Sequence, residues 1–118
     1  MTRFFTRIAA ASLMALVSTA AFAAEPENTL VISLKDGDVT IALRPDLAPK
    51  HVEQIKALTR KGAYDNVVFH RVIDGFMVQG GGYDAEDVKK PVRAPVQNEA
   101  DNGLKNTKGT VAMARTSD

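Results

Sequence analysis

Residues 64–82 read YDNVVFHRVIDGFMVQGGG, with two short apolar runs separated by Asp74 and Gly75. An Asp-Gly pair favours a turn because Gly tolerates a positive φ angle. Runs rich in β-branched and aromatic residues favour strands. The stretch therefore predicts a hairpin, with one strand over 67–73 and a second over 76–79, ended by three glycines.

The first strand of this predicted hairpin presents an arginine among apolar side chains. Alternate residues of a strand share a face, so Arg71 would lie on the same face as Phe69 and Ile73. In the second strand, Met77 and Gln79 would share a face in the same way. A fixed cation, an amide that both donates and accepts, and an apolar wall together indicate a binding or catalytic site.

Each of these residues, taken alone, also fits a structural role. Arg71 would suit a strand arginine paired with an acid, and Phe76 and Met77 would suit a core, where Met commonly fills gaps. His70 points to the face opposite Arg71, and we interpret it as a hydrogen-bonded structural histidine rather than a base.

Working outward, the segment before the hairpin predicts two further elements. Residues 29–43 alternate around Asp36-Gly37, which predicts a β-hairpin with one buried face. Pro49 suits a first helical turn, and apolar residues then recur at helical spacing until Gly62, which predicts a helix over 49–61.

The segment after the hairpin predicts a long loop and one more strand. Residues 83–108 are rich in Pro, Gly, Asn, Asp and Lys and show no hydrophobic periodicity, which predicts a long surface loop. Loops of this length in a compact domain are usually functional or lie over a binding face. Residues 109–115 predict a last strand.

The first residues have the features of an exported chain. Arg3 and Arg7 precede an uncharged segment rich in Ala, Leu and Val that ends in Ala21-Phe22-Ala23. This pattern predicts a secretory signal peptide over 1–23, cleaved after Ala23, and a mature domain over 24–118. A retained N-terminal anchor is the alternative. Export without cysteine favours a periplasmic location.

Composition excludes several classes of protein. The chain has 118 residues, which fits one domain, and a net charge of +1, which gives no indication of a nucleic-acid partner. It contains no cysteine, which excludes disulfide scaffolds, cysteine nucleophiles and thiolate zinc sites. With only two histidines, a histidine-rich metal site is disfavoured.

The run from Phe69 to Gly81, Phe-His-Arg-Val-Ile-x-Gly-Phe-Met-x-Gln-Gly-Gly, resembles the signature of the cyclophilins, a family of peptidyl-prolyl cis–trans isomerases. The opening hairpin, the Ala48-Pro49 helix start and the stretches 98–104 and 109–115 extend the resemblance over 29–118, in the manner of a bacterial exported cyclophilin. The resemblance implies a mainly β fold, a closed antiparallel barrel of about eight strands with capping helices. It implies no cofactor and no metal.

The resemblance also implies the role of each site residue. An Xaa-Pro bond rotates over a barrier of about 18–20 kcal/mol, and an enzyme needs only to bind the twisted state more tightly than the planar ones. Arg71 would be the catalytic donor to the prolyl nitrogen. The substrate-binding residues would be Phe76 and Met77 at the proline ring, Gln79 on the substrate backbone, and Ala114 and Arg115 along the neighbouring groove.

The resemblance implies proline-containing or unfolded polypeptides as partners, no nucleic acid, no membrane contact after signal cleavage, and a monomer. Two positions depart from the pattern: Asp74 stands where many members have Pro, and Arg115 where many eukaryotic members have Asn. We expect the barrel to be incomplete at the C-terminus. Two alternatives to an isomerase therefore stay open: a non-catalytic prolyl-peptide binding or chaperone module, and an inactive fragment.

Overall fold

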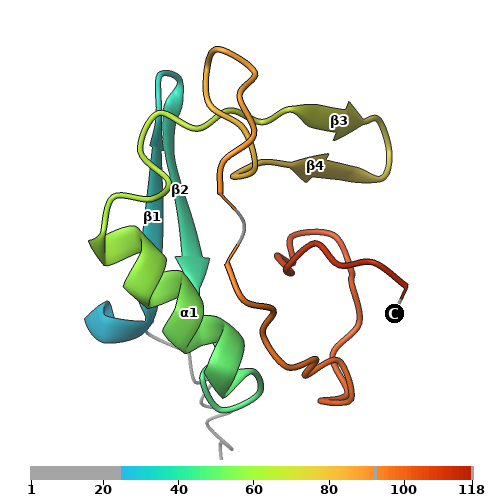
Figure 1. The fold of residues 1–118 in the computed structure, drawn as a ribbon. Helices are drawn as coiled ribbons and strands as arrows, with labels where there is room; N and C mark the ends of the chain where they lie inside the picture. The colour runs from blue at the N-terminus through green and yellow to red at the C-terminus, as the bar shows by residue number, and fades with distance from the viewer. Residues whose placement is uncertain (1–24, 92, 118) are drawn as a thin grey trace, which may run out of the picture.

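The structure is a computed structural model that describes residues 25–91 and 93–117 (Figure 1). The signal peptide predicted over 1–23 lies outside the described residues. Within them, no helix is long and apolar enough to cross a membrane. The elements, in chain order, are η1 (Pro26–Asn28), β1 (Thr29–Leu34), β2 (Gly37–Ala42), α1 (Pro49–Arg60), β3 (Arg71–Ile73) and β4 (Met77–Gln79).

Strands β1 and β2 form the first hairpin, as the alternation of residues 29–43 predicts. They pair antiparallel from Thr29↔Ala42 to Leu34↔Gly37. Gly37 has a φ angle of 131°, a value that favours glycine, and it begins β2 directly after the two turn residues. The predicted hairpin is confirmed, but its predicted buried face is not: Leu30, Ile32 and Ile41 are half-buried, and Leu34 and Val39 are exposed.

Helix α1 begins at Pro49 and ends at Arg60, one residue before the predicted end. Pro49 occupies the first helical turn, where the missing N–H costs no hydrogen bond. The residue before it, Ala48, gives no side-chain cap. After the helix, Gly62 has a φ angle of 67° and its N–H donates to the Thr59 carbonyl, which closes the helix end.

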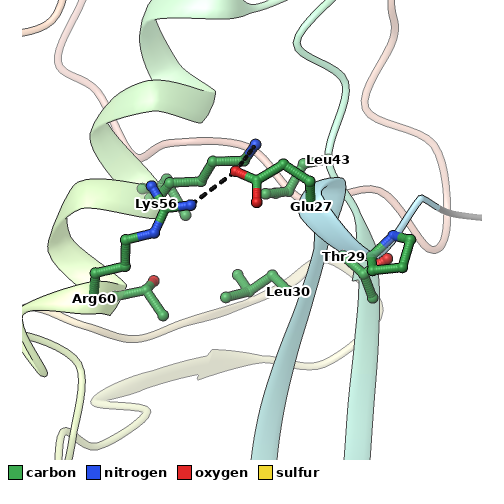
Figure 2. A pocket seen from close by; sticks show the side chains of 9 residues that line it. Glu27, Thr29, Leu30, Leu43, Lys56 and Arg60 are labelled. Atoms are coloured by element: carbon green, nitrogen blue, oxygen red, sulfur yellow. Dashed lines mark hydrogen bonds and ion pairs between the residues drawn. The ribbon is translucent and has the colours of Figure 1, made fainter.

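The inner face of α1 packs beside the first hairpin. Val52 of α1, with 7% of its surface exposed, is the one buried hydrophobic residue in the described part of the chain. A hollow of about 160 Å³ remains between α1 and the start of β1, with Leu30, Leu43 and Ile55 among its lining residues (Figure 2).

The rim of this hollow is an ion-pair cluster. Glu27 accepts hydrogen bonds from Lys56 Nζ at 3.1 Å and from Arg60 Nη2 at 2.8 Å (Figure 2). These hydrogen bonds and the two positive charges lower the pKa of Glu27. The cluster ties η1 to α1, and its charges are satisfied within the protein.

Strands β3 and β4 form a second, separate two-stranded sheet. The regular elements of the described part are thus mostly strands with one α-helix, and no closed barrel is seen among them. The predicted barrel stays a prediction. The strand predicted over 109–115 is wrong for this structure, since those residues are assigned to no strand. The backbone of 109–115 meets no neighbouring strand in the described part, and a strand requires such a neighbour.

Candidate active site

The β3–β4 hairpin brings the predicted central residues together. Arg71 pairs with Gln79, and Ile73 pairs with Met77. Residues directly opposite one another in an antiparallel pair point to the same face, as do alternate residues along one strand. Arg71, Gln79, Ile73 and Met77 therefore share one face of the hairpin, as the sequence predicts.

Arg71 and Gln79 also contact one another through their side chains. Arg71 Nη1 donates to Gln79 Oε1 at 3.4 Å, which is long for a hydrogen bond. It is the only hydrogen bond of the Arg71 guanidinium to a described residue, and Arg71 is exposed. The remaining N–H groups of this planar, permanently charged donor are free to meet an acceptor from outside.

Phe76 and Met77 lie at the turn end of the same hairpin. Phe76 is 78% exposed, and its backbone N–H donates to the Ile73 carbonyl at 3.1 Å. Gly75 takes a φ angle of 68°, which allows the tight turn. Met77 is half-buried. The hairpin therefore carries a large exposed apolar side chain at its turn and, at its other end, a cation with N–H groups left to donate, while the proline pocket itself stays a prediction.

The base of the hairpin contains one extra residue. Val67 forms an isolated antiparallel bridge with Asp84. Three residues separate Val67 from Arg71, whereas four separate Gln79 from Asp84. Such an unequal count is a β-bulge, which bends the strand and interrupts the ladder. The bulge explains why β3 begins at Arg71 and not at Val67 as predicted.

The glycines after β4 make room for aromatic rings. A Cβ atom on Gly80 would lie 2.7 Å from Phe69 Cδ1, closer than real contacts allow. Gly81 has a φ angle of 90°, and a Cβ there would lie 3.3 Å from the Tyr64 ring. Burial raises the pKa of the Tyr64 hydroxyl, the nearby Arg93 charge acting in the opposite direction. Glycine at positions 80 and 81 therefore lets the rings of Phe69 and Tyr64 pack closely against the backbone.

His70 has a structural role, but a different one from that expected. Its ring packs against the Tyr83 ring with centroids 4.6 Å apart and planes tilted by 55°. Within the described residues, its side chain makes no hydrogen bond, so the predicted hydrogen-bonded histidine is wrong in that respect. The tilted Tyr83 ring takes the place of the expected hydrogen-bond partner.

Ala114 and Arg115 are not joined to the hairpin. Both are exposed, and they make no hydrogen bond or ion pair with β3 or β4 in the described part of the chain. Their segment forms no strand there. The structure thus unites Arg71, Met77 and Gln79 and leaves the predicted groove residues apart from them.

A group of polar residues for which no sequence pattern indicates a role reaches back to α1. Gln97, Glu99 and Asn102, which we call the 97–102 anchor, all bond to the start of this helix. The one sequence signal was a helix that begins at Ala48-Pro49 without a capping side chain, so the cap had to come from elsewhere. Nothing local indicates which distant residue supplies it.

Glu99 is the centre of the anchor. One carboxylate oxygen accepts the Lys50 backbone N–H at 3.0 Å, and the other accepts the His51 N–H at 3.0 Å. His51 Nδ1 lies 2.6 Å from the second oxygen. Burial acts to raise the pKa of Glu99, but the hydrogen bonds from the His51 ring and from both backbone N–H groups outweigh it, so the pKa is lowered.

Comparisons with known proteins agree with the motif. A family model described as cyclophilin type peptidyl-prolyl cis-trans isomerase matches residues 29–118. A probable peptidyl-prolyl cis-trans isomerase of Brucella suis is 63% identical over 78 residues, covering 63% of this chain and 39% of that protein. Peptidyl-prolyl cis-trans isomerase A of Dickeya dadantii is 44% identical over 115 residues, covering 95% of this chain and 60% of that protein.

A third relative is peptidyl-prolyl cis-trans isomerase B of Escherichia coli, 51% identical over 80 residues, covering 68% of this chain and 49% of that protein. Across these three relatives, the chain spans between 39% and 60% of the relative's own length.

Proposed function

The chain belongs to the cyclophilin-type peptidyl-prolyl cis–trans isomerase family, and on that premise we propose that it accelerates the rotation of Xaa-Pro bonds in polypeptides. The matched region, residues 29–118, contains the whole β3–β4 hairpin. The observation that carries the proposal is the placement of Arg71, Gln79 and Met77 on one face of this hairpin.

Arg71 is the proposed catalytic residue. Twisting the Xaa-Pro bond ends the conjugation of the prolyl nitrogen with the carbonyl and leaves a lone pair on that nitrogen. A guanidinium N–H aimed at this lone pair stabilises the twisted state more than either planar state, which lowers the barrier. The Arg71 guanidinium suits this task because it is permanently charged, exposed and held by one long hydrogen bond.

The other proposed residues bind the substrate. Phe76 and Met77 receive the proline ring, and Gln79 bonds the peptide backbone while it orients Arg71. Ala114 and Arg115 line the adjoining groove. We propose that this groove forms when residues 109–115 join a closed antiparallel barrel, in which β1 to β4 are the first strands.

The cellular setting is part of the same proposal. The charge pattern of residues 1–23 supports removal of a signal peptide and export to the periplasm, where the protein, as a monomer, would assist the folding of exported chains.

A second candidate function is a prolyl-peptide binding module with little turnover. The separation of Ala114 and Arg115 from the hairpin favours it, because half of the groove is then absent from the site. The large exposed surface of Phe76 would still bind a proline ring.

Cis–trans exchange in a short Xaa-Pro peptide, measured by NMR, tests the proposal. The chain should accelerate exchange, and Arg71→Ala should lower the rate by about 10²–10³-fold, the loss typical when a preorganised transition-state donor is removed. Arg93→Ala is the matched control, since Arg93 is exposed and lies outside the hairpin. Peptide binding without acceleration would instead support the binding module, and equal rates for both variants would exclude Arg71 as the catalytic donor.

A further inference from the structure

The 97–102 anchor connects two parts of the chain that are distant in sequence. Asn102 Nδ2 donates to the Leu47 carbonyl at 3.2 Å, and Lys50 Nζ donates to Gln97 Oε1. With the bonds of Glu99, every contact ends on residues 47–51, which form the entry to α1. Figure 1 shows the later segment running past the N-terminal end of α1.

These contacts are the hydrogen bonds that connect the later segment, residues 93–117, with the earlier part of the described chain. Leaving Thr116 aside, the hydrogen bonds that join the described residues of 93–117 to the earlier part of the described chain all involve Gln97, Glu99 or Asn102. The remaining bonds of the segment are local, such as Thr110 N–H to the Thr107 carbonyl at 3.1 Å. The hydrogen bonds that hold the segment beside the start of α1 therefore lie at the anchor.

Glu99 is the member that the fold holds most firmly. Its side chain is 14% exposed and that of His51 is 23% exposed, whereas the other two carboxylates in described ion pairs, Glu27 and Asp46, are 67% and 58% exposed. Hydrogen bonds to an ionised, shielded carboxylate are stronger than those between neutral groups. The positive end of the α1 dipole adds to this attraction.

The loop around Glu99 is also stiffened from within. Asn98 Oδ1 accepts the Ala100 N–H at 2.9 Å, and Asn102 Oδ1 accepts the Leu104 N–H at 3.0 Å. Both are Asx turns, which fix a short stretch of backbone. The stretch 98–104 is therefore a stiffened link between the Glu99 contacts and the residues that follow Leu104.

We propose that Glu99 is a positioning residue for peptide binding: by holding the 97–102 anchor on α1, it places Ala114 and Arg115 where they can line the substrate groove. This inference rests on the proposed isomerase function. Among the described residues, Glu99 makes no hydrogen bond or ion pair with Arg71, and the hairpin that carries Arg71 has no hydrogen bond to the anchor. Its loss should weaken substrate binding and leave the rotation step itself intact.

The experiment compares Glu99→Ala and Glu99→Gln with the unchanged 118-residue chain, using kcat and KM for cis–trans exchange in an Xaa-Pro peptide with several residues before the proline. Glu99→Ala should raise KM roughly tenfold or more, the loss expected when hydrogen bonds to a charged group are removed. Its kcat should stay within about twofold of the unchanged chain, because the rotation step keeps its transition-state contacts. Glu99→Gln, which keeps one acceptor oxygen, should recover part of the loss.

Glu53→Gln is the matched control, because Glu53 is an exposed glutamate on α1 outside the anchor. It should change neither constant. A fall in kcat at constant KM for Glu99→Ala, or constants equal to those of the unchanged chain, would overturn the inference. If circular dichroism shows that Glu99→Ala loses helix, Glu99→Gln, which keeps one acceptor oxygen, takes its place, with a smaller rise in KM expected and an unchanged KM counting against the inference.

Amide NMR shifts separate failure of this inference from failure of the isomerase proposal. A chain without any acceleration contradicts the isomerase, and the inference is then judged on the backbone signals of 109–115. Shifts of these signals in Glu99→Ala but not in Glu53→Gln would support the positioning role. Signals that stay in place would refute it.

Discussion

At the residue scale, the contact between Gly80 and Phe69 shows how a glycine can be required by a neighbour. Gly80 follows β4 directly, and the Phe69 ring lies where a side chain at position 80 would begin. Because Phe69 precedes Arg71 by two residues, this contact supports the base of the hairpin that holds the proposed catalytic residue.

Gly80→Ala should therefore destabilise the protein. The new Cβ would lie 2.7 Å from Phe69 Cδ1, which forces the ring to move and costs about 1–3 kcal/mol, as overpacking typically does. Phe69 is 48% exposed and can shift, so we expect the lower half of this range. Urea unfolding measures the change.

Gly82→Ala is the comparison for this prediction. A Cβ at Gly82 would lie 3.5 Å from His70 Cε1, an ordinary contact. It should cost less than the change at Gly80. Equal losses for the two variants would show that glycine flexibility, and not the Phe69 contact, determines the effect.

At the element scale, α1 receives its N-terminal cap from another part of the chain. The helix exposes N–H groups that Ala48 cannot satisfy, and Glu99 accepts two of them. The pKa of Glu99 is lower in the folded protein than in the unfolded chain, because the net effect of its surroundings favours the carboxylate. The unfolded chain therefore binds more protons in acid.

The stability of α1 should depend on pH accordingly. The contribution of Glu99 is present in full above its ordinary pKa of 4.5 and is lost as the pH falls through the lower pKa of the folded protein. Circular dichroism at 222 nm during urea unfolding, repeated between about pH 7 and pH 3, measures the loss.

Glu99→Gln should flatten this pH dependence, whereas Glu53→Gln should leave it as it is. Some dependence will remain, because Glu27 and Asp46 also have lowered pKa values. A full acid transition in Glu99→Gln would contradict the assignment to Glu99.

The elements that the sequence predicted are those whose signals are local. The 29–42 hairpin, the 49–60 helix and the 71–79 hairpin each carry their own turn or stop residues, such as Gly37, Gly62 and Gly75. The site residues Arg71, Met77 and Gln79 could be placed on one face because pairing follows from the turn. The bulge at Gly80–Gly82, the reach of Glu99 to α1 and the absence of a strand over 109–115 in the described part depend on distant partners, which local patterns do not contain.

At the scale of the whole molecule, many large apolar side chains remain exposed because the described elements do not cover them. Val52 is the one buried hydrophobic residue among the described positions. Val72 and Val78 pair on the hairpin face opposite Arg71 and are 66% and 61% exposed. Together with Val111, 70% exposed, they present surface that further strands of the proposed barrel would cover.

The 118-residue chain should bind the hydrophobic dye ANS, and Val72→Thr with Val78→Thr should remove most of the fluorescence gain. The pair forms a continuous apolar face, whereas Val111 is exposed outside any strand, so Val111→Thr should have a smaller effect. Dye fluorescence at equal protein concentration measures the difference. A chain that does not enhance ANS fluorescence would show that this face is covered in solution.

The capping of α1 by Glu99 also sets an order in time. Glu99 leaves the ribosome 48 residues after His51, which at about 5–20 residues per second corresponds to roughly 2–10 s of synthesis. During that interval the helix has its full sequence but lacks the partner that completes its first turn. The first turn of α1 therefore gains its cap only after Glu99 has been synthesised, and a nascent chain halted before Glu99 should carry a frayed α1.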